Sequence, residues 1–152
     1  MARWLLDEPI VSVYAVGSCL VDPEIGRQGD IDTARTVLRT AGGRLCVISN
    51  TRRSGCGYDQ RIEAFGSAGM LCAGNVAADT VVVATETGVT ASPIFPAFPS
   101  RYAEAYARQL AHFADVLHGR AAVRVDYADG VAALELAEAC ASSLRSGAAV
   151  TL

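Results

Sequence analysis

The residues that could support chemistry begin with the glycine-rich segment Gly55-Cys56-Gly57-Tyr58-Asp59-Gln60. This segment starts like a dinucleotide-binding fingerprint, but it lacks the third glycine and leads into a pattern typical of a strand. The fingerprint has to open a helix, because the N-terminus of that helix receives the pyrophosphate. We therefore predict no cofactor site here, and the glycines serve backbone geometry in a loop.

The two histidines do not have the spacing of a metal site. His112 and His118 lie six positions apart on one predicted helix, so their side chains point in different directions. No cluster of Asp, Glu or Cys stands near them at the spacing of metal ligands. We expect structural or surface roles for both histidines and predict no metal ligand in this chain.

Acid–base and nucleophilic chemistry also lack their usual residues. The pairs Asp30/Asp32 and Asp126/Asp129 are typical of strand-entry and helix-cap positions rather than of an acid/base couple. No G-x-S-x-G motif is present, and neither histidine has an evident orienting carboxylate. All thirteen basic residues are arginine, so any catalytic lysine would have to come from another polypeptide. We predict no catalytic residue in this chain.

Composition excludes further classes of function. The chain of 152 residues, 51% of them hydrophobic, has the size of one ordinary domain, residues 1–152. A net charge of −3 argues against nucleic acid as a partner, because phosphate binding needs a basic surface. No apolar run reaches the length of a membrane span, and the N-terminus does not resemble a secretion signal, so we expect a cytoplasmic protein without a membrane partner. The odd number of cysteines, without a C-x-x-C pair, fits that expectation: Cys19, Cys46, Cys56, Cys72 and Cys140.

The first part of the chain has the pattern of an antiparallel meander. Ala41-Gly42-Gly43 forms a turn so short that it can join only antiparallel neighbours. Residues 58–65 alternate, with Tyr58 and Ile62 on one face and Asp59 on the other. The predicted strands are 10–16, 31–39, 44–52, 58–65, 70–72 and 80–85, the last clear strand, and residues 149–152 could return as a short final strand.

Two amphipathic helices follow an extended connector, residues 92–99, which contains three prolines. Ser100 is a plausible N-cap for the first helix, and Asp126 with Asp129 opens the second, which Gly147 closes. The stripes predicted to be buried are Tyr102, Tyr106, Leu110, Phe113 and Leu117 in the first helix, and Tyr127, Val131, Leu134, Ala137, Ala141 and Leu144 in the second. For the aromatic residues we favour core packing over a nucleotide-stacking platform.

These elements predict an α+β fold, with an open, mainly antiparallel sheet of about six strands, two C-terminal helices packed on one face, and no Rossmann domain. The other face of the sheet must meet solvent, a missing domain or another copy of the chain. A single chain would expose a sizeable apolar surface there. We therefore expect self-association through the open sheet face, as a dimer or tetramer.

The segment from Gly57 to Leu71, Gly-Tyr-Asp-Gln-Arg-Ile-Glu-Ala-Phe-Gly-Ser-Ala-Gly-Met-Leu, resembles a known oxidoreductase domain. It is similar to the C-terminal domain of inositol 2-dehydrogenase-like members of the glucose-fructose oxidoreductase/inositol dehydrogenase (Gfo/Idh/MocA) family. Further motifs of this resemblance occur in the family's order, namely residues 2–6, 17–23, 29–34, 101–106, 129–130 and 144–147. The resemblance covers essentially the whole chain.

The resemblance implies a two-domain enzyme whose N-terminal Rossmann domain holds NAD. The domain in this chain would help to shape the substrate pocket and build oligomers. In the family, a lysine of a Glu-Lys-Pro motif and an Asp-x-x-x-His pair assist hydride transfer from a polyol carbon to the nicotinamide, and both motifs lie upstream of Met1. This chain is thus expected to bind no cofactor itself, and a separate Rossmann-domain chain is a candidate partner.

One position of the family's site falls within this chain. Tyr58, in Gly-Tyr-Asp, resembles the tyrosine that reaches the sugar or inositol, and a phenol can both donate a hydrogen bond to a hydroxyl and accept one from it. The alternative interpretation is a half-buried strand residue next to a turn. Relatives commonly carry an aromatic residue two positions earlier, where this chain has Cys56, so we expect the pocket wall to differ in shape.

The leading hypothesis is therefore the C-terminal domain of an NAD-dependent inositol or polyol dehydrogenase, inactive alone. Two alternatives from other classes stay open: a stand-alone oligomerisation module, and a binding domain that keeps affinity for a polyol without chemistry.

Overall fold

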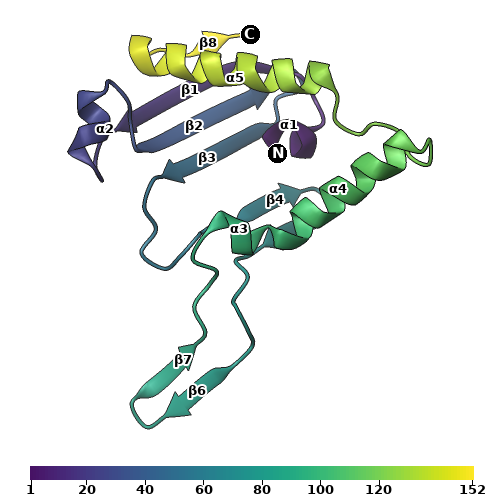
Figure 1. The fold of residues 1–152 in the computed structure, drawn as a ribbon. Coiled ribbons are helices and arrows are strands. Elements are labelled where there is room, and N and C mark those ends of the chain that lie inside the picture. Colours follow the sequence, from purple (N-terminus) through teal and green to yellow (C-terminus); the bar gives the residue numbers. More distant parts are fainter. The chain divides into compact units, whose positions relative to one another are not determined.

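The computed structural model describes all of residues 1–152, which form two compact units. The first unit comprises residues 1–53 and 124–152, and the second comprises residues 54–123. Each unit has its own strands and helices (Figure 1).

The first unit contains a four-stranded antiparallel sheet with the strand order β3-β2-β1-β8. The glycine turn at residues 41–43 joins β2 to β3, as predicted from its length. The elements of this unit are α1 (Ala2–Leu6), β1 (Ile10–Ser18), α2 (Pro23–Arg27), β2 (Thr33–Thr40), β3 (Leu45–Thr51), α5 (Tyr127–Ser146) and β8 (Val150–Thr151). The short β8 confirms the predicted return of the chain at its end.

Helix α5 covers one face of this sheet and runs along β1 (Figure 1). Val13 of β1 and Leu38 of β2 are register partners with no exposed surface, and they form the core together with Ala139 of α5. The helix begins with the predicted capping box, in which the Asp126 carboxylate accepts from the backbone N–H of Asp129 at 3.1 Å and the reciprocal bond is also made. Helix and sheet thus bury their apolar sides against each other.

The face that α5 buries differs from the predicted stripe. Tyr127 and Leu134 were expected to be buried, but they are 88% and 60% exposed. The Ser143 hydroxyl explains the difference, because it accepts from the Ala15 N–H at 2.9 Å and donates to the Ala148 carbonyl at 2.7 Å. A polar residue here satisfies backbone groups that the short β8 leaves unpaired. The face towards the sheet consists of Leu136, Ala139, Cys140 and Ser143.

Asp32 fixes the loop that follows β1 to the start of β2. Its carboxylate accepts from the backbone N–H groups of Leu20 at 2.9 Å, Val21 at 2.7 Å and Asp22 at 2.9 Å, and from the Thr33 hydroxyl at 2.9 Å. Burial by itself would raise the pKa of Asp32, but these hydrogen bonds outweigh burial and hold the pKa well below its usual range. The strand-entry role predicted for Asp32 is confirmed.

Replacing Asp32 by Asn is expected to lower the melting temperature by roughly 5–10 °C, because an amide NH2 would face backbone donors that need an acceptor. Asp30→Asn is the matched control, since Asp30 is exposed and accepts only from the adjacent Ile31 N–H. Because the folded-state pKa of Asp32 is lowered, its contribution is full above about pH 3.9 and is lost as the pH falls further. Equal melting temperatures for both variants in calorimetric scans at pH 7 would contradict this role.

The face of the sheet opposite α5 carries an apolar row. Tyr14, Val37 and Val47 are neighbours in the registers of β1, β2 and β3, and they are 41%, 40% and 66% exposed. Arg35 and Arg39 lie two positions to either side of Val37 and share its face. We call the residues Tyr14, Val37 and Val47 the open-face row. No element of the first unit covers it.

The second unit contains two β-hairpins and two helices. They are β4 (Ile62–Gly66), β5 (Gly69–Ala73), β6 (Val82–Thr85), β7 (Gly88–Ala91), α3 (Phe98–Arg101) and α4 (Ala103–Leu117). The predicted α+β class and antiparallel pairing are confirmed, while the strands are divided among one four-stranded sheet and two hairpins. Strand β7, which the sequence analysis did not identify, consists of only four residues, Gly-Val-Thr-Ala.

Helix α4 departs from the prediction in its start and in its burial. Ser100 lies inside α3, with its hydroxyl donating to the Ala97 carbonyl at 2.9 Å, and Tyr102 is the N-cap of α4. Pro99, whose ring fixes φ near the helical value, lies in the first turn of the earlier helix α3, which begins at Phe98. Phe113 is 59% exposed, so the prediction that it packs in a core is wrong. No helix of the chain is both long and apolar enough to cross a bilayer.

Candidate functional site around Tyr58

The backbone of Tyr58 is held against the connector that precedes α3. Gly57 has a φ of 119°, and a Cβ added there would lie 2.7 Å from Ile94 Cγ1 and 3.0 Å from the Phe95 carbonyl oxygen. The Tyr58 N–H donates to the same carbonyl at 2.8 Å. Glycine is therefore required at position 57 both by the conformation and by the close approach of the connector.

The ring of Tyr58 packs against two aromatic residues of the same unit. Its centroid lies 5.7 Å from that of Tyr102, edge to face at 83°, and 6.4 Å from that of Phe98, tilted at 59°. These distances are within the range of favourable aromatic pairs. Tyr58 nevertheless stays 36% exposed, so the ring is supported and part of its surface remains available to a ligand.

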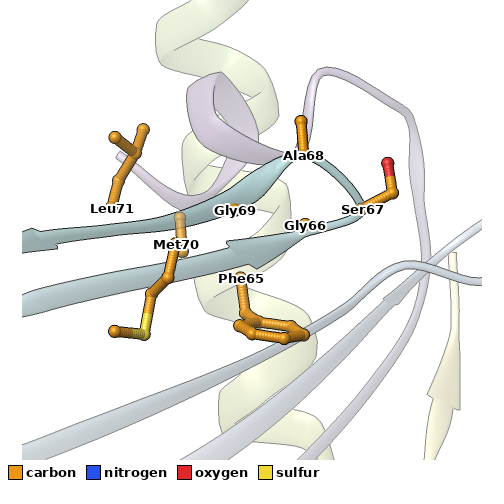
Figure 2. Close-up of a pocket in the computed structure, with 8 residues that line it drawn as sticks. Phe65, Gly66, Ser67, Ala68, Gly69, Met70 and Leu71 are labelled. Carbon is orange, nitrogen blue, oxygen red and sulfur yellow. The ribbon is translucent and has the colours of Figure 1, made fainter.

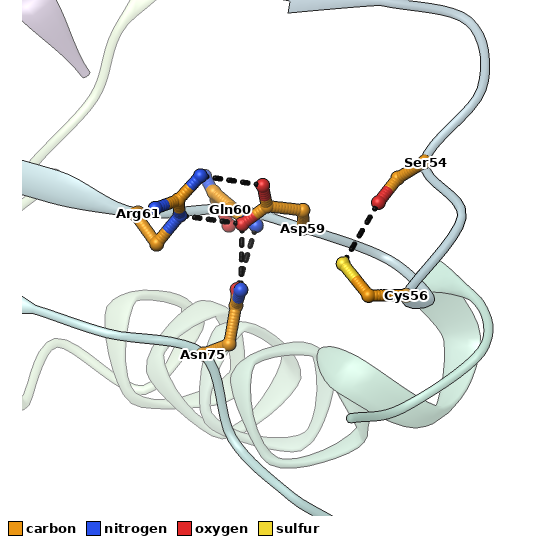
Figure 3. Close-up of polar contacts among 6 residues, drawn as sticks. All are labelled: Ser54, Cys56, Asp59, Gln60, Arg61 and Asn75. Carbon is orange, nitrogen blue, oxygen red and sulfur yellow. Dashed lines mark hydrogen bonds and ion pairs between the residues drawn. The ribbon is translucent and has the colours of Figure 1, made fainter. Parts of the chain in front are cut away.

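A polar network lies on the residues that follow Tyr58 (Figure 3). The Asp59 carboxylate accepts from Arg61 Nε at 2.8 Å and from the Asn75 amide at 2.6 Å, while the Gln60 N–H donates to Asn75 Oδ1 at 2.8 Å. The hydrogen bonds from Arg61 and Asn75 lower the pKa of Asp59, so this carboxylate is an ion at neutral pH and a poor general base. The network fixes the chain between Tyr58 and β4.

The predicted strand at residues 58–65 is shorter in the structure, because β4 begins at Ile62. The side chains still alternate in exposure as predicted, since Gln60, Ile62 and Ala64 are half-buried and the residues between them are exposed. The side chain of Asn75 takes the hydrogen-bonding position that a neighbouring strand would have filled at Gln60.

Residues 55–60 do not fit a dinucleotide. The segment runs through a turn and the irregular chain before β4, and it opens no helix whose N-terminus could receive a pyrophosphate. Cys56 is exposed and its thiol lies 3.2 Å from the Ser54 hydroxyl (Figure 3), so the bulk of an aromatic ring is missing there.

A surface hollow over the β4–β5 hairpin offers little for catalysis. It is lined by residues 64–71, where Phe65 and Met70 are register partners and Ser67 supplies the only side-chain hydroxyl (Figure 2). Elsewhere, His118 is the C-cap of α4, with Nδ1 at 2.6 Å from the Ala114 carbonyl oxygen. No group of three or more His, Cys, Asp or Glu side chains is placed to hold a metal ion.

The sequence analysis proposed Tyr58 as a site residue but did not name the residues that support its ring. Tyr102 was assigned to a buried helix stripe, Phe98 to a connector, and Gln60 only to a strand face. The structure brings Phe98 and Tyr102 to the Tyr58 ring, and the Tyr102 hydroxyl donates to the Gln60 amide oxygen. The spacing of Phe98, Tyr102 and Tyr106, four residues each, is the signal that could have shown an aromatic cluster.

Comparison with known proteins agrees with this architecture. The model of the oxidoreductase family, C-terminal alpha/beta domain (Gfo/Idh/MocA), matches residues 1–152. The chain belongs to this family. Tyr58 therefore lies in the C-terminal domain of an inositol dehydrogenase-like oxidoreductase family.

Individual relatives within the Gfo/Idh/MocA family are inositol dehydrogenases. The inositol 2-dehydrogenase of Rhizobium meliloti (strain 1021) is 42% identical over 144 residues, which cover 95% of this chain and 44% of that protein. The scyllo-inositol 2-dehydrogenase (NAD(+)) of Bacillus subtilis (strain 168) is 33% identical and matches 100% of this chain and 44% of that protein.

A solved structure in the family has the same fold. The crystal structure of a myo-inositol dehydrogenase from Corynebacterium glutamicum ATCC 13032 superposes with a TM-score of 0.91 at 42% identity, over 99% of this chain and 45% of that chain. The chain thus spans less than half the length of the family proteins it matches.

Proposed function

We propose that this chain is the substrate-side domain of an NAD-dependent dehydrogenase that oxidises an inositol-type polyol, and that Tyr58 contacts the polyol. The observation that carries the proposal is that the Tyr58 ring is held in place and is still partly exposed. Its ring is supported by Tyr102 and Phe98 while more than a third of its surface stays exposed. A phenol held in this way can donate to one hydroxyl of a cyclic polyol and accept from another.

The domain alone is proposed to be catalytically silent. Hydride transfer from a carbinol carbon needs a bound nicotinamide, a base for the hydroxyl proton and a fixed geometry between them. This chain has no lysine, and Asp59, the carboxylate next to Tyr58 in the sequence, is paired with Arg61. The choice of NAD is supported by the name of the Bacillus subtilis relative, which includes NAD(+).

The test is Tyr58→Phe in a protein that joins residues 1–152 to the N-terminal part of the Rhizobium meliloti relative. We expect kcat/KM for myo-inositol to fall about tenfold, because the variant loses hydrogen bonds to the polyol. The KM for NAD should stay unchanged, since the ring remains and Tyr58 is proposed to contact the polyol rather than the cofactor. Tyr106→Phe, which removes a hydroxyl from the same aromatic cluster, is the matched control. Unchanged inositol kinetics in the Tyr58 variant would remove this residue from the site.

A second candidate function is an assembly module, and the open-face row favours it. Tyr14, Val37 and Val47 form an apolar patch on a sheet face that nothing in the first unit covers. We propose that two copies of the chain pack through this face, as a dimer or within a tetramer, in the isolated domain and in the dehydrogenase alike. A cytoplasmic location is proposed as well, supported by five cysteines that are all free.

A further inference from the structure

The orientation of the Tyr58 side chain depends on residues that are distant in sequence. The backbone of Tyr58 is fixed by its bond to the Phe95 carbonyl, but a tyrosine ring can still rotate about χ1 and χ2. Two contacts restrict that rotation, the edge-to-face contact with Tyr102 at 5.7 Å and the tilted contact with Phe98 at 6.4 Å. Both partners come from the start of the helical segment, about forty residues later in the chain.

Tyr102 is itself held from several sides. Its hydroxyl donates to the Gln60 amide oxygen, and its ring meets Tyr106 edge to face with centroids 6.4 Å apart. The Arg101 guanidinium carbon lies 5.7 Å from the centroid of the Tyr102 ring, within the range of a cation–π contact. Gln60 in turn donates its backbone N–H to Asn75. The Tyr102 hydroxyl is therefore a fixed point rather than a mobile surface group.

The neighbouring Tyr58 phenol also affects the ionisation of Tyr102. Burial raises the pKa of Tyr102, and the Tyr58 phenol, whose ring lies 5.7 Å away between centroids, raises the pKa further. Both effects keep Tyr102 in its neutral form at physiological pH. In that form it can both donate to Gln60 and accept from the Tyr58 hydroxyl.

We infer that Tyr102 is a positioning residue for the polyol site, whose ring and Gln60-bound hydroxyl fix the direction in which the Tyr58 hydroxyl points. This inference rests on the proposed function of Tyr58 and deepens it. Tyr102 does not need to touch the substrate. It reduces the conformational freedom that Tyr58 would otherwise lose when a polyol binds, which is how preorganised side chains improve binding.

The first test needs no activity and uses residues 1–152 as they are. The five tyrosines, labelled with 13C at Cζ, are titrated by NMR. Tyr58→Phe is expected to lower the titration midpoint of Tyr102, because the interacting phenol is gone, while Tyr127→Phe should leave it unchanged, since Tyr127 is 88% exposed in the first unit. An unchanged Tyr102 midpoint in the Tyr58 variant would overturn the inference, whatever the enzyme does.

The second test is a double-mutant cycle in the fused dehydrogenase described above. Tyr102→Phe keeps the ring and removes the hydroxyl, and we expect it to reduce kcat/KM for myo-inositol about fivefold without changing the KM for NAD. In the Tyr58→Phe background the same substitution should cost less than about twofold, because no hydroxyl remains to be oriented. A merely structural role would give the same loss in both backgrounds, and that result would overturn the inference. A fused protein that is inactive with Tyr58 and Tyr102 intact would refute the proposed function instead, and the titration would still decide whether the two phenols interact.

Discussion

Residues 1–152 alone are expected to form no NADH from myo-inositol, and their fusion to the N-terminal part of the Rhizobium meliloti relative is expected to raise turnover by more than about a thousandfold. The first physical reason is that the chain has no lysine. The second is that the segment resembling a dinucleotide fingerprint, residues 55–60, does not open a helix. In the proposed function, the chain contributes the domain that carries Tyr58 and its aromatic partners. The measurement is the increase in absorbance at the NADH band under saturating NAD and inositol.

Two controls make this comparison specific. The N-terminal part of the relative alone should be inactive as well, because it lacks the residues that match this chain over 44% of the relative's length. A fused protein with Gly57→Ala should also lose activity, because a Cβ at position 57 would collide with Ile94 and the Phe95 carbonyl and displace Tyr58. Turnover by residues 1–152 without a fusion partner would contradict the account, since the proposed function assigns the cofactor and the catalytic lysine to another part of the enzyme.

Val37→Asp is expected to weaken self-association by about a hundredfold or more, because it places a carboxylate in the centre of the open-face row, where a partner would bury it. In a single chain the same carboxylate is tolerated. It remains in contact with water, and Arg35 and Arg39 share its face on the same strand. The variant should therefore remain folded and lose its ability to self-associate. Sedimentation equilibrium at several protein concentrations measures the change.

The matched control for this surface is Tyr127→Asp. Tyr127 is 88% exposed in the same unit, and an acidic residue in the first turn of α5 is favoured by the helix dipole. This control should associate like the unmodified chain. If Val37→Asp and the unmodified chain have the same mass at all concentrations, the open-face row is not the interface.

Local patterns predicted the strands and caps of the first unit because their causes are local. The turn at residues 41–43 permits only an antiparallel pair, and the Asp126/Asp129 capping box places the start of α5. The buried face of α5 was not predictable in the same way. It is set by Ser143, whose hydroxyl bonds to a strand that lies far away in sequence, and hydrophobicity alone favoured the larger side chains Leu134 and Tyr127.

The candidate site shows the same division between local and distant causes. Tyr58 was proposed as a site residue from a motif of contiguous residues, and the preceding Gly57 was interpreted as part of a loop. The roles of Phe98, Tyr102 and Asn75 depend on contacts across fifteen or more positions, which no pattern of neighbouring residues contains. The division of strands into a sheet and two hairpins likewise reflects tertiary pairing rather than propensity.

The most direct test of the central claim is a calorimetric titration of NAD into purified residues 1–152, followed by myo-inositol. The account predicts no heat of binding for NAD, because the proposed function assigns the polyol contact to this chain and the cofactor to another part of the enzyme. Stoichiometric NAD binding by the isolated chain would contradict it, and would place a cofactor site within these 152 residues.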